Sequence, residues 1–467
     1  MVLSRIWSAF IIVAIAIASI KYISSSSYKT IFNDMVVGKG GDTVQIATQK
    51  MIALSPVLRD SLMKKPDFED NRIHYKTDSL RQEVKVYRVQ EADGVIGTSE
   101  TAVKICLGLI GIMALFMGFM SIAEKAGGIN LLSRLIQPFF SKLFPEIPKN
   151  HPAFGHMLMN FSANLLGLDN AATPFGLKAM ESLQTLNPNK DTATNSQIMF
   201  LCLHAGGMTL IPVSIIALRS SAGSKNPTDI FLYCMIATFA ATLAAMIIVS
   251  LYQKINLLKP IVLAYVGGIS VLIGLLVWYL TSLSKENLDT FSQILSNGLI
   301  LFIFLAIVLG AVYKKINVFE AFVDGAKEGF TTSVKIIPYL VGMLIAISLL
   351  RTSGVFDVII DGMKWVANAA NLDARFVDGM PTALIKPLSG SGARGMMMDT
   401  MATFGPDSFQ GKLAAVLQGS SDTTFYVIAV YFGAVAVKNT RYTVIAMLLA
   451  DLVGIITSIV LAYLFFA

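Results

Sequence analysis

Apolar runs about 20 residues long recur along most of this chain and limit what it can fold into more than any other feature. A helix needs about 20 largely apolar residues to cross the hydrocarbon core of a bilayer. Nine runs approach that requirement, so the sequence predicts an all-α polytopic membrane protein with about nine transmembrane helices. The predicted spans lie near residues 5–23, 101–123, 197–218, 229–252, 260–282, 292–313, 332–350, 413–436 and 443–466.

The composition of the 467-residue chain agrees with this prediction, because 54% of its residues are hydrophobic and 14% are charged. An ordinary soluble domain carries about 25% charged residues. The net charge of +7 comes from charges between the apolar runs and not from a basic stripe, which excludes nucleic-acid binding as the main function. Cys106, Cys202 and Cys234 lie inside apolar runs without CxxC spacing, and the four histidines are scattered. We therefore predict no metal site and no cofactor.

The first apolar run could be a cleaved signal peptide or an uncleaved membrane anchor. Its apolar core is short, and only Arg5 precedes it. The residues around Lys21 and Tyr22 do not form a small-residue cleavage signal, which favours an anchor helix over residues 1–23.

Residues 24–99 differ in kind from the rest of the chain, because they are rich in serine and charged residues. They predict a small soluble insertion in water. Val84, Val86 and Val89 indicate a short strand within it.

Two further apolar segments, near residues 151–183 and 379–404, are each interrupted by a cluster of small and polar residues. The interruptions are residues 167–174 and 386–394. Unwound backbone at membrane depth is tolerated only where it lines a cavity or is buried in protein. The two segments therefore predict two re-entrant hairpins.

The hairpins have matching surroundings, which indicates an internal repeat. Thr101-Ala-Val-Lys-Ile105 opens the span before the first hairpin, and Thr332-Ser-Val-Lys-Ile336 opens the span before the second. Five predicted crossings separate the hairpins, and an odd number places them on opposite faces of the membrane. Two such inverted repeats are typical of secondary transporters. The alternative is that Gly- and Ser-rich helices resemble one another because they pack closely.

The orientation follows from lysine and arginine in the short loops, which concentrate on the cytoplasmic side of membrane proteins. A cytoplasmic N-terminus places more of these residues inside, including Lys314 and Lys315. We expect a multi-pass protein of the bacterial cell inner (cytoplasmic) membrane, with residues 24–99 outside the cell.

Polar groups at membrane depth are costly and usually functional. They gather at the two hairpin tips and in two spans predicted to be broken, at residues 204–212 and 418–424. Half-helix N-termini favour an anion, and Arg394 can bind a carboxylate or phosphate through two hydrogen bonds. The candidate substrate-binding residues are Asn164, Asp169, Asn170, Thr173, His204, Gly207, Lys386, Ser389, Ser391, Arg394, Gln418, Ser420, Ser421, Asp422, Thr423 and Thr424.

A structural interpretation of the same residues stays open. Asp169 and Asp422 could pair with Lys178, Lys386 or Arg394 and only neutralise charge between the hairpins. Asp451, in the last span, could relay protons or pair with a neighbour at a helix end. No nucleophile, base and orienting acid occur together, so the chain is not expected to be an enzyme.

Several long motifs resemble a known family. Residues 164–180 resemble the signature of spore maturation protein A, and residues 387–393, 405–408 and 418–433 resemble that of spore maturation protein B. The first resemblance covers about residues 100–220 and the second about 290–465, as if the two proteins were fused. The resemblance implies the gate, or nucleoside-recognition, superfamily, which includes parts of ferrous-iron and nucleoside transporters. Spore maturation proteins are linked to dehydration of the spore core, but fused relatives also occur where no spore is made.

Together these observations predict five parts. They are an anchor helix (1–23), an extracytoplasmic insertion (24–99), a first gate repeat (100–254), connecting spans (255–328) and a second gate repeat (329–467).

The expected function is secondary transport of a small polar anion, with an alternating-access site between the hairpin tips. Coupling to H⁺ or Na⁺ would use Asp169 or Asp422. The alternative is a membrane scaffold or ligand sensor without transport, in which residues 24–99 bind a cell-envelope partner. Membrane lipid is an expected partner, and homo-oligomerisation stays open.

Overall fold

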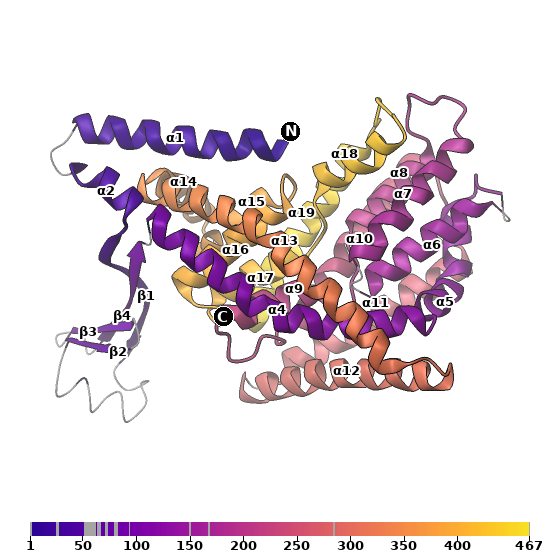
Figure 1. The fold of residues 1–467 in the computed structure, drawn as a ribbon, viewed down its shortest axis with the longest axis horizontal. Helices are drawn as coiled ribbons and strands as arrows, with labels where there is room; N and C mark the ends of the chain where they lie inside the picture. The colour runs from indigo at the N-terminus through magenta and orange to yellow at the C-terminus, as the bar shows by residue number, and fades with distance from the viewer. Residues whose placement is uncertain are drawn as a thin grey trace.

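A computed structural model describes residues 2–24, 28–50, 62, 67–70, 73–78, 83–92, 94–148, 151–166, 169–283 and 285–466. Most of the described chain is helical, and a small sheet lies at one end of the molecule (Figure 1). The elements before the main helical body are α1 (Val2–Ser24), α2 (Ile31–Val36), β1 (Lys39–Lys50), β2 (Asp67–Asp70), β3 (Ile73–Asp78) and β4 (Glu83–Ala92).

The helical body contains two sets of helices joined by a connecting pair. The first set is α4 (Val95–Lys125), α5 (Gly128–Leu143), α6 (Pro152–Leu165), α7 (Asp169–Thr185), α8 (Asn195–Ala205), α9 (Val213–Ser221) and α10 (Phe231–Gln253). The connecting pair is α11 (Pro260–Ser282) and α12 (Lys285–Tyr313). The second set is α13 (Val318–Thr352), α14 (Val355–Ala369), the 3-10 helix η3 (Ala374–Gly379), α15 (Met380–Ile385), α16 (Gly390–Phe404), α17 (Phe409–Gly419), α18 (Thr424–Ala434) and α19 (Thr443–Phe465).

Six helices of the described chain are long and apolar enough to cross a membrane, so the protein is a multi-pass helical membrane protein. Each coincides with one of the nine predicted spans. The six stretches are Trp7–Ser24, Val95–Lys125, Phe231–Gln253, Pro260–Ser282, Gln293–Tyr313 and Thr443–Phe465.

The other three predicted spans are not among these six. The span predicted at 332–350 lies inside the 35-residue helix α13, whose described apolar stretch is Leu340–Thr352. The span at 197–218 divides into α8 and α9, and the span at 413–436 divides into α17 and α18. We call residues 206–212 the first break and residues 420–423 the second break. Both lie within the stretches predicted to be interrupted.

The two sets share the order and many of the lengths of their elements. Helices α8 and α17 have 11 residues each, and α10 and α19 have 23 each. The segment from η3 to α15 occupies the place of α6. Both 11-residue helices begin with a hydroxyl cap, because Thr194 accepts a hydrogen bond from the Gln197 N–H and Ser408 accepts one from the Gly411 N–H. Similar local sequence therefore produces similar helix starts in the two sets.

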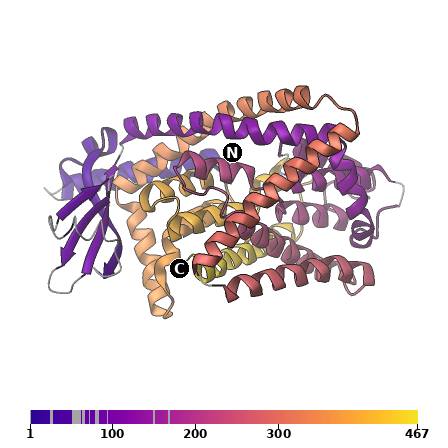
Figure 2. The ribbon, with the colours of Figure 1, turned by 90° about the horizontal axis from the view of Figure 1, so that it is seen from below.

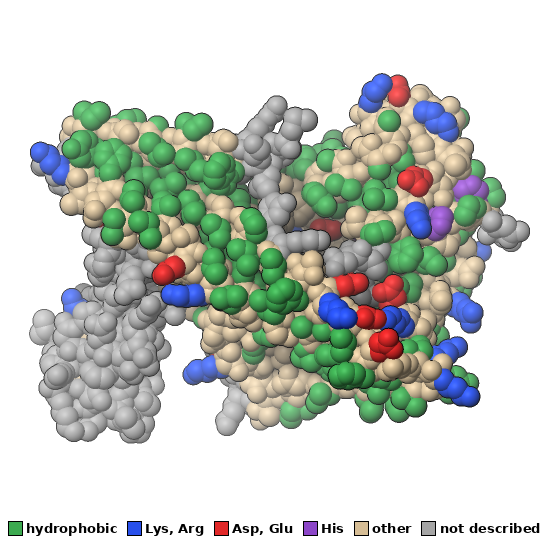
Figure 3. All heavy atoms as spheres, viewed as in Figure 1, with side chains coloured by type: hydrophobic (Ala, Val, Ile, Leu, Met, Phe, Trp, Pro, Cys, Tyr) green, Lys and Arg blue, Asp and Glu red, His purple; other side chains and the backbone are tan. Residues whose placement is uncertain are grey.

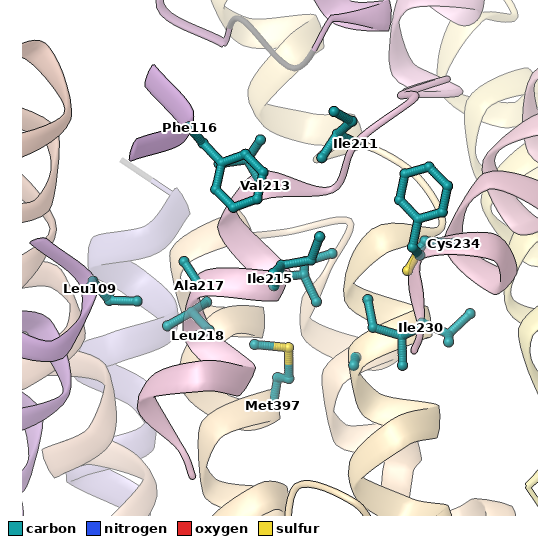
Figure 4. Packing of buried hydrophobic residues seen from close by; sticks show 14 of the residues in the cluster. Leu109, Phe116, Ile211, Val213, Ile215, Ala217, Leu218, Ile230, Cys234 and Met397 are labelled. Atoms are coloured by element: carbon teal, nitrogen blue, oxygen red, sulfur yellow. The ribbon is translucent and has the colours of Figure 1, made fainter. Parts of the chain in front are cut away.

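Contacts between the sets are reciprocal. Helix α8 contacts α18 and α19, while α17 contacts α9 and α10. The largest buried apolar cluster joins both sets, with Leu109 on α4, Leu218 on α9 and Met397 on α16 (Figure 4). The two sets therefore share one core.

The antiparallel sheet, in the strand order β1-β4-β3-β2, adds a β component that the predicted all-α fold class lacks. It lies at one end of the molecule, clear of most helices (Figure 2). The strand indicated by Val84, Val86 and Val89 is confirmed as β4. Val84 is buried between strand neighbours Gln49 and Thr77, as alternating apolar residues in a strand favour.

Helix α1 docks along α13. The Trp7 Nε1–H donates to the Gly342 carbonyl at 2.8 Å, and Lys21 Nζ donates to the Ser353 carbonyl at 2.8 Å. Hydrophobic side chains cover much of the face formed by α1 and α14 (Figure 3). Ile12 of α1 is one of the exposed hydrophobic residues. An exposed apolar face of this extent suits contact with lipid.

The two sets also meet in two pairs of loops, and the first pair is held by a buried arginine. Arg219, in the last turn of α9, has an exposed fraction of 0%. Its Nη2 donates to Asp229 Oδ1 at 2.8 Å and to Asp407 Oδ1 at 3.1 Å. Asp407 also accepts from the Lys225 N–H, and Lys412 pairs with Asp229 at 2.8 Å. We call this junction of loops 222–230 and 405–408 the arginine clamp.

The second pair is held mainly by backbone hydrogen bonds. The N–H groups of Lys438 and Asn439 donate to the Asp191 carbonyl, and the Ala193 N–H donates to the Asn439 carbonyl, each at 2.9 Å. Thr192 and Asn439 form a parallel β-bridge. We call this junction of loops 186–194 and 435–442 the backbone clamp.

Candidate functional site

The two broken helices touch at their breaks. The Asp422 N–H donates to the Ala205 carbonyl at 2.8 Å. Gly207 has φ +63°, and a Cβ there would lie 3.2 Å from the Asp422 nitrogen. Left-handed backbone and close approach both favour glycine. Gly207 therefore permits this contact, which we call the crossing.

His204, at the end of α8, links the crossing to the packed helix pair α6 and α7, which we call the first hairpin. Its Nδ1 lies 2.8 Å from Asn164 Nδ2 and 3.1 Å from Asn160 Oδ1, and the tautomer decides which bond forms. Its Nε2 lies 3.7 Å from Asp422 Oδ2. The imidazole also packs edge-on against Tyr431, with ring centroids 4.9 Å apart. Polar groups from both sets thus meet around one histidine.

The packed helices α15 and α16, which we call the second hairpin, place Lys386 against the same region. Lys386 is buried, and its Nζ donates to the Gln418 carbonyl at 2.6 Å. The Gln418 side-chain oxygen is buried and has no hydrogen-bond partner among the described residues. A buried acceptor of this kind is available to a ligand or an ion.

The start of α16 is set by Ser389, whose hydroxyl accepts a hydrogen bond from the Gly392 N–H at 3.0 Å. A Cβ on Gly390 would lie 2.7 Å from Thr423 Oγ1, so the glycine brings this helix start against the second break. Ser389 and Ser391 have their hydroxyls 3.3 Å apart.

Each hairpin is also joined to the break of its own set through the backbone. The Leu210 N–H donates to the Leu165 carbonyl at 2.8 Å, and the Phe425 N–H donates to the Pro387 carbonyl at 2.9 Å. These two bonds occupy comparable places in the two sets. A hairpin that moves relative to its broken helix must therefore strain or break this bond.

Asp451 of α19 lies behind the second break. Thr424 Oγ1 donates to Asp451 Oδ2 at 2.5 Å. Lys386 and Asp422 are charged neighbours of this carboxylate. The crossing region thus combines two carboxylates, one lysine and one histidine, a set that can take up a proton or a cation.

Arg394 faces a different space. It lies in the second turn of α16 and lines a pocket of about 70 Å³ between α4, α9, α13 and α16. The remaining lining residues are Leu109, Met113, Ser214, Leu218, Leu340 and Ser391. This pocket thus combines a basic side chain with apolar walls, and the carboxylates of the crossing are not among its lining residues.

Comparison with known proteins now decides the family. Residues 106–257 and 333–438, together more than half of the chain, match the gate family, which is described as nucleoside recognition. The chain belongs to the gate family. The matched ranges fall on the two sets of helices, so each set corresponds to a gate segment.

Two curated relatives of this gate protein come from Bacillus subtilis (strain 168). Spore maturation protein B is 48% identical over 172 residues, which are 37% of this chain and 95% of that protein. Spore maturation protein A is 44% identical over 156 residues, which are 33% of this chain and 80% of that protein. No solved structure matches the chain. The resemblance to both spore maturation proteins is confirmed.

The gate segments bring many of the predicted site residues together, in three groups. The crossing collects Asn164, His204, Gly207 and Asp422. The second hairpin and second break collect Lys386, Ser389, Gln418, Ser420, Ser421, Thr423 and Thr424, all of them buried. Ser391 and Arg394 line the separate pocket.

The remaining predicted site residues belong to the first hairpin. The side chains of Asp169 and Asn170 lie outside the described part of the structure. Thr173 is half-buried.

Two interruptions are narrower than predicted. Helix α7 already begins at Asp169, so it takes in most of the stretch 167–174. Helix α16 begins at Gly390, because Ser389 caps it, and Arg394 therefore lies inside a helix and not at an unwound tip.

Three residues near the crossing were not among the predicted site residues. Asn160 donates to the Ala172 carbonyl at 2.6 Å and contacts His204, and Tyr431 packs on the same imidazole. Asp451 was considered only as a relay or helix-end partner. Buried asparagine and tyrosine inside apolar helices were the available signals, because polar groups there need partners.

Proposed function

We propose that this gate protein is a secondary transporter of the bacterial cytoplasmic membrane, which moves a small polar anion by alternating access. The observation that carries the proposal is the crossing of two broken helices at their breaks. Broken helices that meet between two structural repeats are the usual place for a substrate or ion site in secondary transporters.

The shared order of elements supports an inverted repeat, in which α6 with α7 and α15 with α16 form hairpins from opposite faces. The arginine clamp and the backbone clamp then close opposite ends of the path. Opening one clamp while the other stays closed would expose the crossing to one side at a time.

The charged groups at the crossing and at the second hairpin have different proposed roles. Asp422, with His204 3.7 Å away, takes the coupling ion, H⁺ or Na⁺. The anion lies nearer the second hairpin, where Lys386 and Arg394 supply positive charge. With a cytoplasmic N-terminus, the arginine clamp faces outward and the sheet lies outside the cell.

A labelling experiment tests alternating access without knowledge of the solute. The background variant replaces the three buried cysteines Cys106, Cys202 and Cys234 with alanine, and Ser421→Cys reports access to the crossing. Ser224→Cys with Asp407→Cys locks the arginine clamp, because Ser224 Oγ and Asp407 Oδ1 are 2.5 Å apart. Thr192→Cys with Asn439→Cys locks the backbone clamp across the β-bridge.

The reporter is labelled with a membrane-impermeant maleimide from each side of sealed vesicles. We expect labelling only from the side whose clamp is free, and the labelled side should reverse between the two locks. Labelling from one side in both locked variants, or from neither side, contradicts alternating access.

The second candidate function is a membrane scaffold or ligand sensor. The sheet favours it, because it lies at one end of the molecule and β1 and β2 are its edge strands, to which an envelope protein could add a strand. A scaffold predicts that both locked variants keep their function in the cell, whereas a transporter loses it in both.

A further inference from the structure

The Arg394 pocket lies where the two gate segments meet. Helices α4 and α9 of the first set supply one side, and α13 and α16 of the second set supply the other. Leu109, Leu218 and Leu340 are each 2% exposed, so the walls are part of the shared core. Leu109 and Leu218 lie next to each other in Figure 4. A ligand in this pocket therefore contacts both segments at once.

The charge in the pocket is not balanced by protein. Arg394 is half-buried and forms no hydrogen bond or ion pair with another described residue. The next acid along the same helix, Asp399, pairs with Arg351 instead. A guanidinium among apolar side chains is costly unless an anion accompanies it. Among the described residues, Arg394 is thus available to pair with an anion in the pocket.

The size of the pocket limits the anion. The pocket offers about 70 Å³, several times the roughly 10–15 Å³ that a single water needs. That is enough for an acetate, propionate or butyrate ion, and far too little for a nucleoside.

The wall chemistry narrows the class further. Four of the seven lining residues are apolar, and Arg394 is the one formal charge among them. A dianion such as phosphate would bury a second charge without a partner. A carboxylate matches the planar guanidinium through two parallel hydrogen bonds, and the hydroxyls of Ser214 and Ser391 can donate to it.

We infer that the Arg394 pocket binds a short-chain monocarboxylate of two to four carbon atoms. The carboxylate pairs with Arg394, and the hydrocarbon end lies against Leu109, Leu218 and Leu340. The identification of this carboxylate as the transported solute rests on the proposed transport function, but its binding to the pocket can be tested separately.

Isothermal titration calorimetry on the purified full-length protein in detergent tests the inference. The probes are sodium acetate, propionate, butyrate, hexanoate and phosphate, with uridine as a nucleoside, all at constant Na⁺ concentration. We expect butyrate and propionate to bind at least tenfold more tightly than hexanoate, phosphate or uridine. Equal or tighter binding of phosphate or uridine overturns the inference, and so does the absence of carboxylate binding.

Variants locate the site. Arg394→Ala should weaken butyrate binding at least tenfold, and Arg394→Lys should recover part of it, since lysine keeps the charge without the planar fork. Arg375→Ala is the matched control, because Arg375 is exposed and pairs with Asp373 outside the pocket. If Arg394→Ala binds butyrate as the parent does, the carboxylate lies elsewhere and the inference is wrong.

Leu340→Ala separates a specific site from a general loss of structure. The shortened side chain enlarges the pocket, so the preferred chain length should move from butyrate towards hexanoate. An unchanged preference contradicts binding in this pocket.

The outcomes also separate this inference from the proposed function. If the labelling of Ser421→Cys alternates but no carboxylate binds, the proposed solute class is wrong and the transport proposal stands. If a carboxylate binds but the labelling does not alternate, the binding site stands and the transport proposal is wrong.

Discussion

The two clamps join the same pair of gate segments by different physical means. In the arginine clamp, Arg219 is fully buried and holds Asp229 and Asp407 from two loops. In the backbone clamp, loops 186–194 and 435–442 pair through N–H and C=O groups. The one ion pair there, between Lys438 and Asp191, has both side chains exposed, at 80% and 65%.

This difference concerns what happens when each clamp opens. Removing one partner of a buried ion pair leaves the other charge buried without compensation. When the clamp opens instead, water hydrates both charges, and this hydration offsets much of the free energy needed to separate them. The arginine clamp is therefore sensitive to mutation and acid but can open into water. The backbone clamp exchanges hydrogen bonds for bonds to water and depends little on charge.

The largest effect should come from Arg219→Ala. It leaves Asp229 and Asp407 without their shared partner, and we expect the free energy of unfolding to fall by about 3–5 kcal/mol. Chemical denaturation of the purified protein in mild detergent measures it. Arg219→Lys is the control and should recover part of the loss. A loss below about 1 kcal/mol would mean that the two clamps do not differ as described.

Acid should weaken the arginine clamp selectively. Burial raises the pKa of Asp407, but hydrogen bonds from the Lys225 N–H and Ser224 hydroxyl, with the charges of Arg219 and Lys412, outweigh it and hold the pKa below its usual range. A lowered pKa contributes stability above the unfolded value of about 3.9, and that stability is lost as the pH falls through the lower folded value.

The measurement for this prediction compares the parent with Asp407→Asn from pH 6 downward. We expect the stability difference between them to shrink below about pH 4. Asn439→Ala, which changes no titratable group in the backbone clamp, should differ from the parent by the same amount at each pH. A difference for Asp407→Asn that stays constant with pH contradicts the role of this carboxylate.

Arg441→Ala tests how much the side chains contribute to the backbone clamp. Arg441 Nη1 donates to the Ala193 carbonyl at 3.2 Å and to Asn195 Oδ1 at 3.0 Å. Because water can replace these exposed bonds, we expect a loss of only about 1 kcal/mol in the same denaturation assay. A loss as large as that of Arg219→Ala would show that side chains, and not the backbone, hold this clamp.

The smallest effect should come from Lys438→Ala. Its ion pair with Asp191 is 3.4 Å long and exposed, and exposed pairs contribute about 0–1 kcal/mol. The Lys438 N–H bond to the Asp191 carbonyl survives the substitution. We expect a thermal midpoint within about 2 °C of the parent. A clear drop would contradict a clamp that depends on backbone pairing.

The sequence predicted those features that depend on local pattern. Long apolar runs located six spans, and the small polar residues around Gly207 and Ser421 located both helix breaks, because such residues interrupt apolar helices wherever they occur. The strand through Val84 followed from alternation. The all-α fold class describes the membrane body and leaves out the sheet, whose strands β2 and β3 are short and rich in charged residues.

Contacts across the chain could not be predicted in the same way. Arg219 and Asp407 are 188 residues apart, and nothing in either local sequence indicates the other. The charges of Asp169, Asp422, Lys386 and Arg394 predicted one substrate site. The structural alternative was that the two acids pair with Lys178, Lys386 or Arg394. In the structure Asp422 Oδ2 lies 3.7 Å from His204 Nε2, while Arg394 lines a pocket with apolar walls. Tertiary packing, and not composition, divides these charges.

The docking of α1 has a consequence for how the chain is made. Trp7 finds its hydrogen-bond partner in Gly342, which is synthesised 335 residues later. At translation rates of about 5–20 residues per second, α1 waits roughly 20–70 s in the bilayer before α13 emerges. During that interval its indole N–H must be satisfied by lipid or by the insertion machinery. Helix α1 is thus made long before the helix that it packs against.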